Sequence, residues 1–396
     1  MSKAFDFAII GGGLAGSLLF AALKRQNPHL QIGLFEKNST LCGEHHWCFQ
    51  DADIPTGARP WLEGLLSQSW NEQEVLFPSY SRVLRTPYHC IKSEDLAAKL
   101  RDISPQQIYL DHELIGTEET ADQRHLLKFE NQNSIVAHSY ILATNHAHRT
   151  PQGKDLKNTG WQKFVSLEVE LESPHGLQRV LLRDVRQPQI DGYRFFCVLP
   201  LTETRLLIED TYCSNHAILK EERIEKEILA YAERQGWEIK EIARHQHGTL
   251  PLHLQMSPSP EEKTAAGNPL SPPSLGDEAR FVHPVTGHSG AASLRMIQDI
   301  LDRSNLTMAS LRKCIRERLE KESSNYHYLS LMNRLLFLAT KNENRYKIFE
   351  KFYQYPEPLI DRFYAGKLTL MDRARIVMTK PPTSMQSTID ALRMKS

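Results

Sequence analysis

Near its start the chain reads Phe5-Asp6-Phe7-Ala8-Ile9-Ile10-Gly11-Gly12-Gly13-Leu14-Ala15-Gly16, continues through 17–26, and then reads Gln31-Ile32-Gly33-Leu34-Phe35-Glu36. This order predicts a short apolar strand, a glycine-rich turn, a helix of about a dozen residues and a second strand that ends in an acid. A Gly-x-Gly-x-x-Gly turn between a strand and a helix is typical of dinucleotide-binding βαβ units. The stretch therefore predicts a dinucleotide-binding domain.

The glycines of this turn have separate expected roles. Gly11 makes the tight turn, Gly13 lets backbone N–H groups approach a pyrophosphate, and Gly16 lets helix and strand pack closely. The first helical residues, Leu14 and Ala15, place the positive end of the helix dipole toward the same negative charge.

Glu36 stands twenty residues after Gly16, where a carboxylate can accept hydrogen bonds from a ribose. The simpler alternative is an ordinary glycine-rich turn. Because strand, helix, second strand and acid all occur in the expected order, dinucleotide binding is the better interpretation.

Composition excludes several classes of protein. The 396 residues carry no net formal charge and are 40% hydrophobic, so no basic excess exists to neutralise nucleic-acid phosphates. No run approaches the roughly 20 apolar residues of a membrane-spanning helix. We expect no secretory leader, because 5–10 already reads as a strand, and we expect free thiols in a reducing cytosol. The scattered cysteines are Cys42, Cys48, Cys90, Cys197, Cys213 and Cys314.

The segment after the second strand reads Leu41-Cys42-Gly43-Glu44-His45-His46-Trp47-Cys48-Phe49. Adjacent histidines suggest a metal, but neighbours on an extended chain point apart, and no third ligand follows at a recognisable spacing. We expect no metal site. A loop that lines the cofactor or substrate cavity, with Trp47 and Phe49 as apolar wall, is the more plausible interpretation.

The middle of the chain predicts antiparallel strands. Residues 164–171 alternate apolar and polar side chains with period two, and 193–201 and 204–211 can pair through a short turn. We expect one apolar face of this sheet to cover a flavin, although a plain β-sheet core explains most of these side chains. A nucleotide unit followed by inserted antiparallel strands suits a flavoprotein better than a simple two-half NAD enzyme.

A second motif follows a proline-rich loop at 256–277. Gly276-Asp277 and then His283-Pro284-Val285-Thr286-Gly287-His288, leading into a helix, resemble the second flavin motif of flavoprotein hydroxylases. The resemblance implies that Asp277 hydrogen-bonds the ribityl chain and that Pro284 and Gly287 form the turn facing the flavin. The expected dinucleotide is therefore FAD rather than NAD.

The expected fold class is α/β: a Rossmann-type FAD-binding flavoprotein fold, hydroxylase- or glutathione-reductase-like, with an inserted antiparallel β-sheet substrate domain and a helical C-terminal part. The expected domains are 1–60, 93–150 and 265–310 for FAD; 61–92 and 160–264 for the substrate sheet; and 311–396 for the helical region.

The C-terminal region is basic and aromatic. Residues 341–396 hold eleven Lys/Arg against six Asp/Glu, interleaved with Tyr, Phe and Leu. A basic amphipathic helix can dock on an anionic membrane surface. A solvated helix packed on the body of the protein explains the same pattern, so both interpretations stay open.

Nearly the whole chain resembles the bacterial FAD-dependent lycopene β-cyclases. The residues that carry the resemblance are Asp191-Gly192-Tyr193-Arg194-Phe195, Leu199-Pro200-Leu201, Thr204-Arg205-Leu206-Leu207-Ile208-Glu209-Asp210-Thr211, Arg362-Phe363-Tyr364-Ala365-Gly366-Lys367-Leu368-Thr369-Leu370, Gly43-x-His45-x-Trp47-x-Phe49 and His283-Pro284-x-Thr286-Gly287. The resemblance implies bound reduced FAD with NADPH as the reductant, lycopene or a related acyclic carotenoid as substrate, and a cytoplasmic protein peripheral on the inner face of the membrane. It also brings His45 into the set of cofactor-binding candidates.

In that family the acid of the Leu-Ile-Glu-Asp-Thr motif is the proposed acid/base residue, which falls on Glu209. Protonation of a terminal double bond, ring closure and proton loss need a carboxyl that is neutral at pH 7, and desolvation on an apolar sheet face raises a carboxyl pKa. Tyr193, Phe195 and Trp47 could add cation–π stabilisation. The alternative for Glu209 is a salt bridge to an arginine, Arg194 or Arg205; Asp210 should face the other way.

The sequence departs from the family at Ala143-Thr144-Asn145-His146, at Val285-Thr286-Gly287-His288 and in the proline-rich segment before the second motif. Two other functions therefore stay open. One is a flavin monooxygenase or reductase acting on a lipid, which Gly276-Asp277 favours. The other is a family member that binds flavin or polyene without turnover. Whether one ring or two form, the chain length of the carotenoid and the oligomeric state are open as well.

Overall fold

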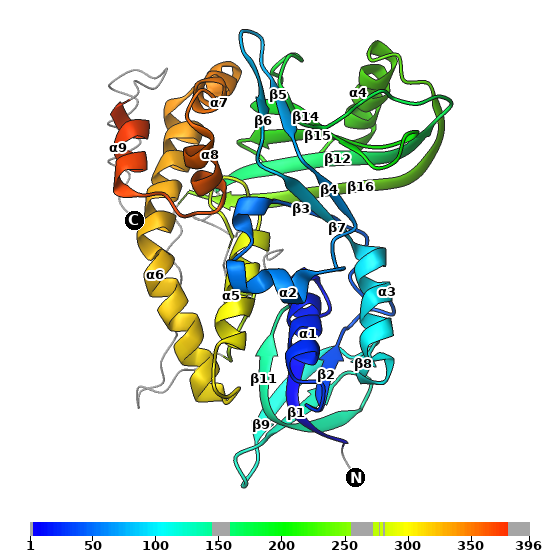
Figure 1. Cartoon of the computed structure of the whole chain (residues 1–396), viewed down its shortest axis with the longest axis vertical. Helices are drawn as coiled ribbons and strands as arrows, with labels where there is room; N and C mark the ends of the chain where they lie inside the picture. Colours follow the sequence, from blue (N-terminus) through cyan, green and yellow to red (C-terminus); the bar gives the residue numbers. More distant parts are fainter. Residues whose placement is uncertain (1–2, 145–158, 255–271, 277, 280–281, 379–396) are drawn as a thin grey trace.

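The computed structural model describes residues 3–144, 159–254, 272–276, 278–279 and 282–378. Figure 1 shows a nucleotide unit around the first strands, a large second sheet above it, and a long helix, α6, that runs beside both. The expected fold class is confirmed. Asn145 and His146 lie outside the described residues.

The nucleotide unit is built on a six-stranded sheet in the order β8-β2-β1-β11-β10-β9. Its first four strands are parallel, and β10 and β9 add an antiparallel edge. Parallel strands need crossover connections, and α1 provides the first of them. The bounds are β1 Lys3–Ile10, α1 Leu14–Gln26, β2 Ile32–Phe35, β8 Ile108–Tyr109, β9 Leu114–Glu119, β10 His125–Phe129 and β11 Ser134–Leu142.

Apolar side chains cover both faces of this sheet. On one face α1 packs with α2 (Arg59–Leu62), α3 (Ser93–Ile103) and α5 (Gly290–Leu301) around a common core. On the other face Phe5, Phe35 and Phe129 form a separate cluster with stacked and edge-on rings. Burial on both faces explains the continuous apolar runs of the first two strands.

The second sheet has seven strands in the order β16-β12-β15-β14-β13-β5-β6. All neighbours are antiparallel except β13 and β5. The predicted pairing of 193–201 with 204–211 is confirmed, since β14 pairs with β15 throughout. The bounds are β5 Gln73–Leu76, β6 Ser81–Leu84, β12 Thr159–Leu171, β13 Val180–Asp184, β14 Tyr193–Pro200, β15 Arg205–Ser214 and β16 Ile239–His253.

Residues 61–92 do not all belong to this sheet. Strands β4 (Gln68–Trp70) and β7 (Tyr88–Lys92) pair with β3 (His46–Gln50) in a separate three-stranded sheet. Only β5 and β6 join the seven-stranded sheet. The strands of 61–92 thus divide between two sheets, which the sequence did not predict, because a period-two pattern predicts a strand but not its partner.

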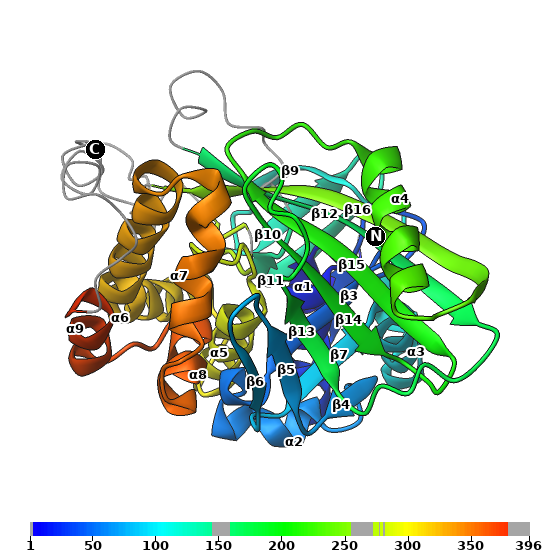
Figure 2. The ribbon, with the colours of Figure 1, turned by 90° about the horizontal axis from the view of Figure 1, so that it is seen from above.

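The two faces of the seven-stranded sheet differ. Helix α4 (Glu221–Arg234) covers one face with Ile224, Ile228 and Tyr231, and we call this the α4 face. Helices α7 (Arg345–Phe352) and α8 (Glu357–Tyr364) pack on the other, which we call the inner face. Figure 2 shows α4 and α7 on opposite sides of the strands. The remaining helices are α6 Met308–Arg334 and α9 Leu370–Met378, and no helix in the described part is long and apolar enough to cross a membrane.

Arg345, at the start of α7, joins the C-terminal helices to the sheet. Its side chain is fully buried. It donates hydrogen bonds to the backbone oxygens of Leu336, Phe337 and Cys213 at 3.0–3.1 Å and to Oδ1 of Asn215 at 2.6 Å. Removing this guanidinium would leave four buried or half-buried acceptors without their donor.

We expect Arg345→Met to lower the free energy of unfolding by about 3–5 kcal/mol, because unsatisfied buried acceptors cost about 1–3 kcal/mol each and part of that cost is relieved by relaxation. Urea unfolding followed by circular dichroism measures it. Lys347→Met, on the exposed side of the same helix, should change stability by less than about 0.5 kcal/mol. Equal effects of the two substitutions would contradict this role for Arg345.

Candidate cofactor site and active site

The glycine turn is sterically required at two positions. Gly11 has φ +111°, and a Cβ there would lie 2.4 Å from the backbone oxygen of Ala143. A Cβ on Gly16 would lie 2.0 Å from the backbone oxygen of Gly11, so strand, turn and helix are in direct backbone contact. At Gly13, by contrast, a Cβ would meet no atom within 4 Å. Backbone atoms therefore exclude a side chain at Gly11 and Gly16, whereas the space beside Gly13 is free of protein atoms.

No side chain caps the N-terminus of α1. Gly13 is the N-cap, and the first turn of the helix contains no acid. The N–H groups that begin the helix at Leu14 and Ala15 therefore present the positive end of the dipole toward the open side of the turn. This arrangement suits a phosphate or pyrophosphate.

Glu36 is held against the same turn. Its Oε2 accepts a hydrogen bond from the Gly12 N–H at 2.7 Å, and its Oε1 accepts from the backbone N and Nδ2 of Asn38 at 3.0 and 2.7 Å. The side chain is largely buried. The carboxylate is therefore fixed in position, and its remaining lone pairs are available to a ribose hydroxyl.

The second motif contacts the first. Gly276 has φ +66°, and a Cβ there would lie 3.0 Å from Cβ of Ala15 in the first turn of α1. Asp277 lies outside the described residues. The contact at Ala15 nevertheless brings the two segments, separated by more than two hundred residues, to one place.

The turn before α5 is closed by its own backbone. The Gly287 N–H donates to the His283 oxygen at 2.8 Å, and the His283 N–H donates to the His288 oxygen at 2.9 Å. Gly287 has φ +70°, and the Pro284 oxygen accepts a hydrogen bond from Nδ2 of Asn333 at 3.0 Å. These hydrogen bonds close the turn and fix it against α6, and a Cβ on Gly287 would lie 3.2 Å from the Leu252 side chain of β16.

His288 closes this turn. Desolvation by the surrounding protein and, to a lesser extent, the charge of Arg183 lower its pKa to about 4. The imidazole is neutral at pH 7.

Glu209 lies at the centre of β15 on the inner face. Its neighbours in register are Cys197 on β14 and Ser166 on β12. It is half-buried and accepts a hydrogen bond at Oε1 from the Thr211 hydroxyl at 2.7 Å. Burial raises the pKa of the Glu209 carboxyl, and the Thr211 hydrogen bond and the Arg183 charge only partly oppose the increase. Its environment therefore favours the protonated form.

Neither arginine suggested by the sequence forms a salt bridge with Glu209. Arg194 pairs with Asp210 at 2.7 Å on the α4 face, and Arg205 pairs with Glu170 at 2.9 Å. Among the described residues Glu209 takes part in no ion pair. Asp210 faces away from Glu209, as the strand geometry predicts, and is bound by Arg194 and the Tyr212 hydroxyl.

Arg183, on β13, is a residue that the sequence analysis missed. Its guanidinium carbon lies 4.1 Å from the centre of the Phe195 ring, and its Nε donates to the Tyr353 hydroxyl at 3.0 Å. The Tyr353 and Tyr364 hydroxyls are 2.6 Å apart. A single arginine in an apolar strand carries no recognisable signal, because its importance comes from neighbours on other elements.

The four aromatic candidates divide into two pairs. Tyr193 and Phe195 lie on the inner face, where Tyr193 stacks on Phe349 with ring centres 4.2 Å apart. Trp47 and Phe49 instead pack against the core of the nucleotide unit. Side chains alternate along β3, so Cys48 points the other way and lies near Cys197 and Glu209. The expectation that Trp47 and Phe49 line the cofactor or substrate cavity stays a prediction.

The histidines of the same segment also separate. His45 is exposed and binds Ser93 through its backbone N and O, at 3.0 and 2.9 Å. The His46 ring is buried, with Nε2 3.5 Å from Oε2 of Glu168. Within the described residues no group of three His, Cys, Asp or Glu is placed to hold a metal ion.

The chain has the α/β fold of FAD-dependent monooxygenases and reductases. A geranylgeranyl bacteriochlorophyll reductase-like protein from Thermoplasma acidophilum has a similar structure, with a TM-score of 0.56 and 12% identity over 99% of this chain and 96% of that one. A variant of HpxO from Klebsiella pneumoniae complexed with FAD gives a TM-score of 0.57 and 14% identity over 99% of both chains.

Sequence comparison identifies the family. The model of the family described as lycopene cyclase protein matches residues 6–390. The chain is 32% identical to a lycopene beta-cyclase of Pseudescherichia vulneris over 96% of this chain and 95% of the relative. It is 31% identical to a lycopene beta-cyclase of Pantoea ananas over 99% of each. The chain belongs to the lycopene cyclase family.

We expect Arg183→Met to raise the pKa of the Glu209 carboxyl further above its ordinary value, because the substitution removes a positive charge that favours the carboxylate. Difference infrared spectroscopy of the protonated C=O band, followed through a pH titration and assigned with Glu209→Gln, measures the change. Arg186→Met is the control, since Arg186 pairs with Asp184 at 2.7 Å. A titration of Glu209 that Arg183→Met leaves unchanged would exclude this electrostatic coupling.

Proposed function

We propose that this protein is a lycopene β-cyclase that closes the acyclic ψ end groups of lycopene into β-rings, giving γ-carotene and β-carotene. The observation that carries the proposal is Glu209: a carboxyl on the inner face of the sheet, without an ion pair in the described part of the chain, whose pKa burial raises. Family membership supports the choice of substrate.

The reaction is an isomerisation. Glu209 gives its proton to the terminal double bond, which leaves a tertiary cation; the next double bond attacks to form the ring, and a proton leaves a neighbouring carbon. Since the Thr211 hydroxyl donates to Oε1, the acidic proton belongs on Oε2. Atoms and charge balance without oxidation, and the carboxylate left by the first step is a base close to the new cation.

Aromatic rings on the inner face stabilise positive charge. Tyr193 and Phe195 each can contribute about 0.5–2 kcal/mol by cation–π attraction. Phe349 stacks on Tyr193, and the Arg183 guanidinium lies over Phe195, while both side chains are buried. The reaction also requires that water be kept from the cation, because water would trap it as an alcohol.

FAD is the expected cofactor, and the chain fits it. The open side of the turn at Gly13, the uncapped N-terminus of α1 and the fixed Glu36 carboxylate suit its pyrophosphate and ribose. Bound in reduced form, with NADPH as the reductant, FAD supplies an electron-rich ring that stabilises nearby positive charge. The full set of residues proposed to hold it is Gly11, Gly13, Leu14, Ala15, Gly16, Glu36, His45, Asp277, Pro284 and Gly287.

A flavin monooxygenase or reductase of a lipid is the second candidate, and the likeness to reductase-type structures favours it. It predicts stoichiometric oxidation of NADPH with substrate, whereas a cyclase consumes none per ring. A family member without turnover predicts no new pigment. Expression in a lycopene-accumulating bacterium, with pigments identified by colour and mass, separates the three functions.

We expect Glu209→Gln to lower the rate of β-ring formation at least about a hundredfold, because an amide cannot serve as the general acid. Carotenoids extracted from the lycopene-accumulating host and from an anaerobic assay with reduced FAD measure the rate. Glu203→Gln, an exposed carboxylate beyond the inner face, should leave it unchanged. Near wild-type cyclisation by Glu209→Gln would remove this assignment.

We further propose that the protein is cytoplasmic and docks on the inner face of the membrane, from which a forty-carbon hydrocarbon must be extracted. Helix α9 supports this: Leu370, Met371, Val377 and Met378 are 60–82% exposed. The helix is fixed to the body through Asp372, which pairs with Arg362 at 2.7 Å. Its basic neighbours are Lys367, Arg373 and Arg375.

Leu370→Ser/Met371→Ser should weaken binding to phosphatidylcholine vesicles about tenfold, since each side chain contributes part of its apolar transfer energy. Flotation measures the binding. Ile115→Ser, which removes a 66% exposed side chain from β9, is the matched control. Point substitutions are preferable to deleting 341–396, which would also remove the buried Arg345. Unchanged flotation would exclude α9 as the docking element.

A further inference from the structure

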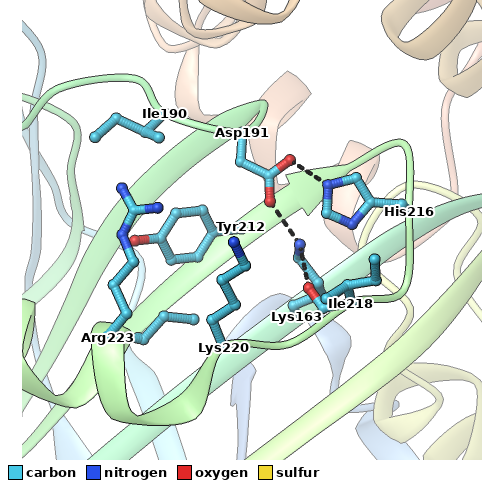
Figure 3. A pocket seen from close by; sticks show the side chains of 9 residues that line it. Lys163, Ile190, Asp191, Tyr212, His216, Ile218, Lys220 and Arg223 are labelled. Atoms are coloured by element: carbon cyan, nitrogen blue, oxygen red, sulfur yellow. Dashed lines mark hydrogen bonds and ion pairs between the residues drawn. The ribbon is translucent and has the colours of Figure 1, made fainter.

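A cavity of about 270 Å³ lies on the α4 face of the seven-stranded sheet, beside the start of α4 (Figure 3). Tyr212, which lines it, lies in the cluster packed under α4, whereas Glu209 on the same strand faces the opposite way. The cavity is therefore separate from the proposed active site. Its polar lining consists of Lys163, Asp191, Tyr212, His216, Lys220 and Arg223.

A buried ion pair forms the floor of the cavity. The Lys163 side chain is 2% exposed, and its ammonium donates to Oδ2 of Asp191 at 2.6 Å and to the Ile218 oxygen at 2.8 Å. Oδ1 of Asp191 accepts from the Ser214 hydroxyl at 2.8 Å and lies 2.9 Å from Nε2 of His216. An ammonium has three N–H donors, and these contacts use two of them.

Asp191 remains charged in this setting. Burial, the largest influence, would raise its pKa, but the hydrogen bonds from Lys163 and Ser214 and the nearby positive charge hold the pKa below its ordinary value. Lys163 and Asp191 therefore neutralise each other. This pair therefore does not neutralise any additional positive charge on the cavity wall.

Lys220 and Arg223 supply that further charge. Both are exposed, line the cavity, and have no ion-pair or hydrogen-bonding side-chain partner among the described residues. Figure 3 shows both side chains extending from the start of α4 toward the turn at Asp191. Two acids of the same helix are occupied elsewhere: Glu221 lies 3.0 Å from His247, and Glu225 lies 3.5 Å from His245.

The start of α4 borders the cavity. Lys220 is its N-cap, and no side chain caps the helix. Glu221 and Glu222 in the first turn offset the positive end of the helix dipole, but neither lines the cavity. Two unpaired cations and a buried ammonium with a spare donor thus surround the cavity.

We propose that this cavity binds a phosphate group, carried either by a soluble phosphoester or by the headgroup of an anionic lipid. Guanidinium and ammonium groups together with helix N–H donors are the usual ligands of phosphate oxygens. The volume is well above the share of about 30 Å³ that one water takes in the liquid, so it accommodates a phosphate with part of its substituent. Ile190 and Ile218, 38% and 63% exposed, flank the opening and suit the apolar part of such a ligand.

A purely structural role explains only part of this arrangement. Asp191 and Gly192 both have positive φ, +63° and +108°, and the Lys163–Asp191 pair holds that turn in place. Holding the turn through this ion pair requires neither Lys220 nor Arg223. The test therefore removes these two cations and leaves Lys163 and Asp191 intact.

The test compares Lys220→Gln/Arg223→Gln with the control Lys226→Gln/Lys240→Gln, which removes two exposed positive charges outside the cavity. In one arm, calorimetric titration of the full chain with inorganic phosphate and with glycerol 3-phosphate measures soluble binding. In the other, flotation compares phosphatidylcholine vesicles with and without phosphatidylglycerol. We expect the cavity variant to bind at least about tenfold more weakly, for the loss of two charge-assisted hydrogen bonds, and the control to match the unmodified protein.

If only the cavity variant binds the soluble phosphates more weakly, the ligand is a phosphoester. If only the cavity variant binds phosphatidylglycerol vesicles more weakly, the ligand is a lipid headgroup. Either result supports the proposal. Equal binding by the cavity variant and the control in both arms overturns it. The result is independent of the cyclase proposal, because the cavity variant should still cyclise lycopene supplied in detergent. The test also distinguishes the cavity from docking through α9, because the α9 substitutions should weaken binding to uncharged phosphatidylcholine vesicles as well.

Discussion

The alternation of side chains along β15 is the constraint on which the proposed chemistry depends. Adjacent residues of a strand face opposite ways, so Glu209 and Asp210 have opposite environments. Asp210 meets Arg194 and remains part of a buried ion pair on the α4 face. Glu209 meets a hydroxyl and apolar neighbours on the inner face, where burial raises its pKa. A one-residue shift in the pairing of β14 with β15 would exchange the two carboxyls and remove the neutral acid.

Close steric contacts hold the two motifs of the nucleotide unit together. Gly276 approaches Ala15 closely enough that a Cβ would touch its methyl group, and Gly16 rests on the backbone of Gly11. These contacts bring the start of the second motif to the first turn of α1. A Cβ on Gly16 would overlap the Gly11 oxygen, and a residue with a side chain in place of Gly276 would have to adopt a positive φ against Ala15, so the position of these elements depends on both glycines.

Patterns within short stretches of sequence predicted those elements whose geometry depends on residues close together in the chain. The βαβ unit from Phe5 to Glu36 and the β14–β15 pairing were predictable, because their periodicity and turn residues lie within short stretches. The direction in which the Trp47 and Phe49 side chains point could not be predicted, because it depends on which strand pairs with β3. Arg183 was missed for a related reason: Phe195, Tyr353 and Glu209 come from three other elements, and only the folded chain brings them around it.

Arg183 presents an apparent conflict, because a fixed cation beside a reaction that forms a carbocation should oppose it. Acid strength resolves the conflict. A carboxyl buried without compensation holds its proton too tightly to protonate an alkene, whereas one in water loses it before the substrate arrives. Burial raises the pKa of Glu209, and Arg183 together with the Thr211 hydrogen bond limits that increase and so limits how weak an acid the carboxyl becomes. The Tyr353 hydroxyl and the Phe195 ring hold the guanidinium in place, so its charge acts on Glu209 without moving toward the substrate.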